Sequence, residues 1–326
     1  MPVTSLNAAM LQDSVERSAR VIALARLQRL LEEAARVEVR TGADSSPDTS
    51  DPEAIHDFRV ALRRLRAWLR AFRPYFADTV RHGPERRLRT LSRLAGRARD
   101  LEVQCRWLAG LRRSRSTLVQ DEARRLIGQV DREQARARRV LTKGLVTELP
   151  ETAVELAEAL RHDGWEIQLA EQPHERMAAV MADAVRQATD AVTADLRSVH
   201  RLDQIEEAHA ARISIKRLRY LLEAFGRTSR SATCILAQLA TLQHLFGELH
   251  DAQVLQRRLR EPHGASPAAA ALRARLARRA ATAFRQARRA VGSAATDAMF
   301  TRLTAFIRRL ERVGRMGDLL VPTGSQ

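Results

Sequence analysis

The spacing of apolar side chains predicts a chain built almost entirely of α-helices. After Pro52 the apolar positions recur at steps of three and four residues, at Phe58, Leu62, Leu65, Leu69 and Phe72, and such steps place side chains on one helix face. Similar periodicity predicts helices over 11–39, 53–73, 84–112, 117–143 and 151–162, and then over 174–200, 206–226, 231–260, 268–292 and 296–313. No alternating Val/Ile/Thr-rich segment indicates a strand. We therefore predict an all-α protein.

The helical pattern occurs twice along the chain. Residues 56–66 recur as residues 209–219, with the histidine and the basic positions kept, and residues 94–100 correspond to residues 245–251. Because the order and spacing of both blocks are preserved, the sequence predicts an internal duplication. We expect two helical bundles of about four to five helices each, 1–165 and 166–318, which together form one unit. The tail, 319–326, is expected to be disordered.

A line of basic side chains runs beside the apolar seam in each half. In the first half it comprises His56, Arg59, Arg63, Arg66, Arg70 and Arg73. These positions also step by three and four, so they form a stripe about 100° from the seam. In the second half the stripe comprises His209, Arg212, Lys216 and Arg219, and it ends there because Glu223 and Gly226 replace Arg70 and Arg73. A stripe next to the core is where the wall of a groove would lie.

The overall charge indicates the class of ligand. The 326 residues include 56 basic and 39 acidic ones, which gives a formal net charge of +17, and so large an excess predicts attraction to a polyanion. Only Lys143 and Lys216 are lysines. Arginine forks can make paired hydrogen bonds to phosphate oxygens, although a GC-rich genome would by itself also favour arginine.

The two pairs of blocks resemble the CHAD family, the conserved histidine α-helical domain. The resemblance rests on "IHDFRVALRRLRAWLRAF" and "ARISIKRLRYLLEAF", followed by "LAGRARDLEV" and "LQHLFGELHDAQV" in that order. It implies two helical bundles related by a pseudo-twofold axis, with a basic cleft between them that binds inorganic polyphosphate. It implies no catalysis. The chain is similar to the stand-alone form, because it has no Glu-x-Glu-x-Lys segment of the triphosphate-tunnel enzymes to which such units are often fused.

From the stripes and the resemblance we select candidate binding residues. We predict phosphate contacts from His56, Arg59, Arg63, Arg64, Arg66, Arg70, Arg93, His209, Arg212, Lys216, Arg217, Arg219 and His244. Arg64 and Arg217 lie off the main stripe. Asp100 and Asp251 cannot bind an anion directly, so we interpret them as partners that orient nearby arginines. For His56 and His209, a structural hydrogen bond and metal ligation are the alternatives to a phosphate contact.

Two other functions compete with polyphosphate binding. Sequence-independent nucleic-acid binding is less favoured, because single-strand binders usually offer aromatic stacking platforms; here only 4% of residues are aromatic, and two rings off the seam, Trp68 and Tyr220, do not make a platform. A metal-dependent phosphohydrolase is suggested by His-Asp pairs at 56–57, 162–163 and 250–251, but cation-rich stripes beside them would repel a divalent ion. We predict no catalysis, no cofactor and no metal, and the sequence identifies no protein partner.

The expected location follows from the cysteines and the hydropathy. Cys105 and Cys234 fall in apolar helical surroundings and are interpreted as buried free thiols of a reducing compartment. No continuous apolar stretch is long enough to span a membrane. We expect a soluble cytoplasmic protein without a membrane anchor, which the resemblance associates with polyphosphate granules.

Overall fold

The computed structural model describes residues 5–39, 53–76, 79–80, 82–111, 116–161, 175–258 and 267–316. Within these ranges the chain is helical, with a single isolated β-bridge between Ser14 and Arg176 and no strand. The predicted all-α fold is confirmed. The predicted boundary at 165/166 and the tail 319–326 lie outside the described residues, and the pseudo-twofold axis stays a prediction.

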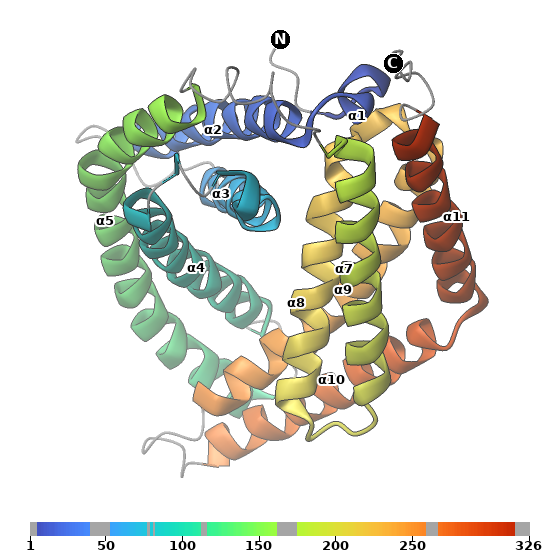
Figure 1. The fold of residues 1–326 in the computed structure, drawn as a ribbon. Coiled ribbons are helices and arrows are strands. Elements are labelled where there is room, and N and C mark those ends of the chain that lie inside the picture. Colours follow the sequence, from blue (N-terminus) through green and yellow to red (C-terminus); the bar gives the residue numbers. More distant parts are fainter. Residues whose placement is uncertain are drawn as a thin grey trace, which may run out of the picture.

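The helices form two bundles that lie side by side (Figure 1). The first bundle comprises α2 (Val15–Val39), α3 (Ala54–Ala71), α4 (His82–Leu111) and α5 (Thr117–Arg161), with the short 3₁₀ helix η2 (Arg73–Phe76) after α3. The second comprises α7 (Met177–Ser198), α8 (Ile205–Leu222), η3 (Glu223–Thr228), α9 (Arg230–Arg258), α10 (Pro267–Val291) and α11 (Ala294–Met316). The bundles meet where α3 packs on α8, where α2 packs on α7, and where α10 reaches α5.

The apolar seam of α3 forms the core of the first bundle. All five predicted seam positions, from Phe58 to Phe72, are buried. Trp68 is buried as well, although it was placed off the seam, and its indole N–H donates to the carbonyl of Ala19 on α2 at 2.9 Å. On α8, Tyr220 is also buried. Each ring is therefore covered by a neighbouring helix. Trp68 packs against α2, and Tyr220 lies beside Arg63 of α3.

One helix boundary was predicted wrongly. The sequence pattern separates 117–143 from 151–162, whereas α5 continues through Pro150 as one helix. Proline removes one backbone hydrogen bond, but the buried face continues across it, with Leu145 and Leu149 before the proline and Leu156 after it. The hydroxyl of Thr152 also donates to the carbonyl of Glu148 at 2.5 Å. Burial against α4 and α2 therefore outweighs the local cost of proline.

The N-terminal segment packs on the second bundle. The short helix α1 (Ala8–Gln12) contacts α7 and α11, and the backbone N–H of Leu6 donates to the carbonyl of Ala224 at 2.6 Å. Gly226 beside it has a φ of 46°, and a Cβ atom there would collide with the hydroxyl of Ser5. This close approach requires glycine. The segment before α2 thus ties the start of the chain to its second half.

The two cysteines are free, as expected, but neither is fully buried. Cys105 on α4 is half-buried, and its thiol donates to Asp131 on α5 at 3.2 Å. Cys234 on α9 is exposed. The expectation of burial is therefore wrong for Cys234, because its position in an apolar stretch lies on the solvent side of α9.

Candidate functional site

The contact between α3 and α8 brings basic side chains of both halves together. Arg59 and Arg63 extend from α3, and Arg212 and Lys216 extend from α8; we call these four residues the central cluster. They lie close enough that Arg63 and Arg212 lower the pKa of Lys216, and Arg59 lowers that of Arg212. The sequence predicted all four residues, but it could not show that they face one another.

The charges of the central cluster are poorly hydrated. The side chain of Arg59 is 18% exposed and Lys216 is 6% exposed. Burial lowers the pKa of each arginine in the cluster. For Lys216, burial and the neighbouring arginines lower the pKa to about 5, so the amine is neutral at pH 7 when no anion is present. Burial disfavours a charge unless an opposite charge replaces the lost water.

Two carboxylates border the central cluster. Asp100 on α4 lies with one carboxylate oxygen 3.7 Å from a guanidinium nitrogen of Arg59. Asp251 on α9 raises the pKa of Arg212, while burial raises the pKa of Asp251 itself. The buried Nε of Arg212 has no hydrogen-bond partner among the described residues. The acids thus balance only part of the positive charge.

Histidines lie at the edge of the central cluster. Burial, followed by the charge of Arg99, lowers the pKa of His56. Burial, followed by the charge of Arg212, lowers the pKa of His209. The ring of His250 lies 5.3 Å from that of His209, and burial lowers its pKa to about 4. Burial and neighbouring charges thus favour the neutral form of all three imidazoles.

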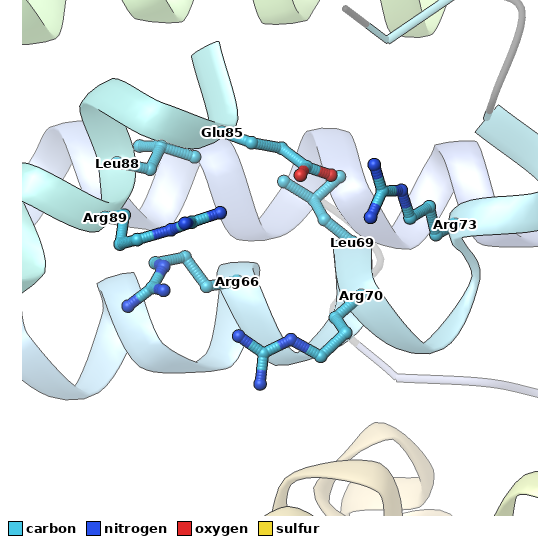
Figure 2. A pocket seen from close by; sticks show the side chains of 7 residues that line it. All are labelled: Arg66, Leu69, Arg70, Arg73, Glu85, Leu88 and Arg89. Atoms are coloured by element: carbon cyan, nitrogen blue, oxygen red, sulfur yellow. The ribbon is translucent and has the colours of Figure 1, made fainter. Parts of the chain in front are cut away.

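The basic stripe on α3 contributes side chains to two different sites. Arg66 and Arg70 line a second, separate recess, which we call the distal pocket. It is lined by Arg66, Leu69, Arg70 and Arg73 from α3 and η2, and by Glu85, Leu88 and Arg89 from α4 (Figure 2). The stripe is therefore shared between α8 and α4. Arg63 lies beside Tyr220 of α8, whereas α4 borders both the first turns of the stripe, through Asp100, and its last turns, through Arg89.

Arg64 and Arg219 take part in a link between the bundles. The Nε of Arg64 on α3 lies 2.6 Å from a carboxylate oxygen of Glu223, and the Nε of Arg219 on α8 lies 3.0 Å from the other oxygen. Arg219 also donates to the side chain of Gln243 at 3.1 Å. Both arginines pair with a carboxylate here, and their predicted phosphate contacts stay a prediction.

Beneath this link lies Arg26 of α2, which the sequence analysis did not select. Its guanidinium donates to the carbonyl of Arg64 at 2.8 Å and to the carbonyl of Tyr220 at 3.4 Å, and it stacks on Trp68. Burial lowers its pKa to about 10. The sequence does contain a sign of its burial, because Arg26 lies on the apolar face of its helix, four residues before Leu30.

The remaining predicted contacts lie outside the central cluster. Arg93, Arg217 and His244 are exposed, and Arg93 donates to the hydroxyl of Thr90 at 3.1 Å. In the described part of the chain, no hydrogen bond or ion pair joins these three to the cluster. Sequence analysis also missed Arg89, whose signal was its place four residues before Arg93 on one face of α4, and it did not select Tyr220, whose ring lies 5.8 Å from the guanidinium of Arg63.

The two His-Asp pairs within the described residues, at 56–57 and 250–251, form no shared metal site. Asp57 binds Arg36 at 3.1 Å, and the pair at 162–163 lies outside the described residues. Among the residues that the structure describes, no group of three or more His, Cys, Asp or Glu side chains could hold a metal ion. Within the same residues, no helix is both long and apolar enough to cross a bilayer.

Comparison with known proteins agrees with the fold. The family model described as "CHAD domain" matches residues 21–260. A solved structure, the crystal structure of the CHAD domain from the plant Ricinus communis, is similar over 93% of this chain and 95% of that chain, with 21% identity and a TM-score of 0.62. No curated protein matches the chain. The family match covers most of the sequence, including both α3 and α8 with their basic stripes, and the chain belongs to the CHAD domain family.

Proposed function

We propose that this protein binds inorganic polyphosphate and does not change it chemically. The observation that carries the proposal is the central cluster, in which Arg59 and Arg63 of one bundle meet Arg212 and Lys216 of the other. Like charges held together in a poorly hydrated place cost free energy. A bound polyanion offsets that cost, because each phosphate supplies the opposite charge and accepts hydrogen bonds from arginine forks.

The binding energy would come mainly from electrostatics. Phosphates of a linear polymer carry condensed counterions, and these are released when basic side chains replace them. If about six phosphates are neutralised, the logarithm of the association constant falls with the logarithm of salt concentration with a slope of roughly −4. The unpartnered Nε of Arg212 supplies one donor that is ready for such a ligand.

A nucleic acid presents the same phosphates but also bases that need a stacking surface. Trp68 and Tyr220 are both buried, and Tyr220 faces Arg63, so neither ring is presented to a base. Polyphosphate has no bases and needs no such surface. The nucleic acid therefore serves as the control ligand in the test.

The test is a calorimetric titration with long-chain polyphosphate beside a single-stranded oligonucleotide of equal charge, at two salt concentrations. We expect saturable polyphosphate binding that weakens less with salt than oligonucleotide binding does. Equal affinity and equal salt sensitivity for both ligands would overturn the proposal. Incubation with polyphosphate and Mg²⁺ or Mn²⁺ tests the absence of catalysis, because chain length on a gel should not change.

We also propose that the protein resides in the cytoplasm and associates with polyphosphate granules. The support is the proposed affinity for long chains, which granules contain at high local concentration. A fluorescent fusion should colocalise with a polyphosphate stain, and a fusion carrying Arg59→Gln and Arg63→Gln should be diffuse. Colocalisation that is unaffected by these substitutions would contradict this part of the proposal.

A further inference from the structure

We propose that the distal pocket is a separate subsite for a terminal phosphoryl group, the end of a phosphate chain. The inference rests on the proposed function, because it takes polyphosphate as the ligand. It adds a second binding site, which recognises the end of the phosphate chain. It starts from the cations of the pocket, which are Arg66, Arg70, Arg73 and Arg89, and from its single carboxylate, Glu85.

The arginines of the pocket repel one another, and Glu85 is the single carboxylate in its lining that balances their charge. Burial lowers the pKa of Arg66, and the neighbouring charges of Arg70 and Arg89 lower it further, whereas Glu85 raises it. Arg70 and Arg89 are exposed at the rim, and neither forms an ion pair or a side-chain hydrogen bond within the described ranges. A bound phosphoryl anion would relieve this repulsion.

The lining of the pocket suits a single phosphoryl group, because its residues come from both α3 and α4. Leu69 and Leu88 are buried and line it from two helices. Arg66 and Arg89 lie near each other in Figure 2, with Glu85 between Arg89 and Arg73 in this view. Arginines therefore approach from both α3 and α4, as paired donors to the several oxygens of one phosphoryl group would.

Glu85 is what distinguishes a chain end from a chain interior. An interior phosphate carries one negative charge and no proton near neutral pH, so a carboxylate only repels it. A terminal phosphoryl group loses its second proton at a pKa of roughly 6. While it keeps that proton, its P–OH group can donate a hydrogen bond to the carboxylate of Glu85. The pocket thus combines cations for charge with one acceptor that favours a terminal group.

The test compares three small ligands in calorimetric titrations of the full chain at pH 6.5. Linear tripolyphosphate has two ends, cyclic trimetaphosphate has none, and orthophosphate is an isolated terminal group. We expect tripolyphosphate to bind at least about tenfold more tightly than trimetaphosphate. Orthophosphate binding as tight as tripolyphosphate binding would overturn the assignment to a chain end. Equal affinity for the linear and cyclic compounds would overturn the subsite itself.

Two variants locate the effect in the pocket. Arg70→Gln with Arg89→Gln should weaken tripolyphosphate binding about tenfold or more and change trimetaphosphate binding less than about twofold. The matched control is Arg136→Gln with Arg139→Gln, which removes the same charge from exposed positions on α5 and should leave the preference intact. Equal losses in both double variants would show a general charge effect and contradict the subsite.

Glu85→Gln provides an independent readout. Removing the negative charge should raise the affinity for trimetaphosphate by a few-fold and narrow the preference for the linear compound. A preference that stays unchanged would contradict the role of Glu85. If the wild-type protein distinguishes linear from cyclic compounds but binds long chains no better than an oligonucleotide, the proposed function fails and this subsite stands. If the protein binds long chains specifically but does not prefer linear to cyclic compounds, the proposed function stands and this subsite fails.

Discussion

The guanidinium of Arg64 on α3 contacts the carboxylate of Glu223 across the boundary between the two bundles, at 2.6 Å. The side chain of Glu223 is only 12% exposed, and it also binds Arg219 and raises the pKa of the buried Arg26. One acid therefore compensates three cations that meet at the join of the two halves. This join fixes the spacing of α3 and α8, on which the central cluster depends.

Glu223→Gln should lower the free energy of unfolding by about 2 kcal/mol, because it leaves the charge of Arg26 without its nearest compensation. Chemical denaturation monitored by circular dichroism measures this loss. The control is Glu151→Gln, an exposed acid on α5, which should change stability by less than about 0.5 kcal/mol. Equal stability of the two variants would show that the carboxylate of Glu223 contributes nothing to the join.

Arg26→Lys should also destabilise the fold, by about 2 kcal/mol. An ammonium keeps the charge but cannot reach the carbonyls of Arg64 and Tyr220 with one planar fork, as the guanidinium does. The midpoint of thermal unfolding reports the effect. The matched control is Arg139→Lys at an exposed position on α5; a shift in Arg26→Lys no larger than in the control would refute the structural role of Arg26.

Arg59→Gln with Arg63→Gln should weaken polyphosphate binding about tenfold or more while helicity stays unchanged. Both side chains belong to the central cluster, and their pKa values are lowered by burial and by neighbouring cations. Without ligand, the double variant should therefore be at least as stable as the wild type, because mutual repulsion is removed. Arg136→Gln with Arg139→Gln is the control of equal charge, and it should lose much less affinity. Retained affinity in the cluster variant would mean that the ligand binds elsewhere.

Lys216 should make stability depend on pH. Its pKa is about 5 in the folded chain and about 10.4 in an unfolded one, so between these values the unfolded state binds more protons. The free energy of unfolding contributed by Lys216 therefore rises with pH across this window and is smallest below pH 5. Lys216→Met should flatten the profile measured by denaturation between about pH 6 and pH 9. Parallel profiles for variant and wild type would contradict the lowered pKa.

The same group should couple ligand binding to protonation. A bound phosphate favours the charged amine, so binding at about pH 7.5 should take up protons from the buffer. Calorimetric titrations in two buffers of different ionisation enthalpy measure this uptake. We expect fewer protons to be taken up by Lys216→Met, with the imidazoles of His56 and His209 accounting for the remainder. Proton release on binding would contradict this account.

Helix positions could be predicted from the sequence because they depend on local spacing. The steps of three and four from Phe58 to Phe72 marked the buried face of α3, and the structure buries all of these positions. The same periodicity failed at Pro150, where local preference for a helix end is outweighed by packing of α5 against α4. It also failed to select Arg26, since a buried guanidinium depends on carbonyls from other helices.

The sequence by itself thus determined the all-α class, the two related sets of basic side chains and their angle to the apolar seam, since a helix fixes the relative direction of its own side chains. Only the tertiary structure decided what each basic side chain faces. Arg63 faces Lys216, Arg64 is bound by Glu223, and Arg66 faces Arg89. Basic side chains that are neighbours on α3 meet different partners because α8 and α4 both pack against this helix, and periodicity along one helix carries no information about its neighbours.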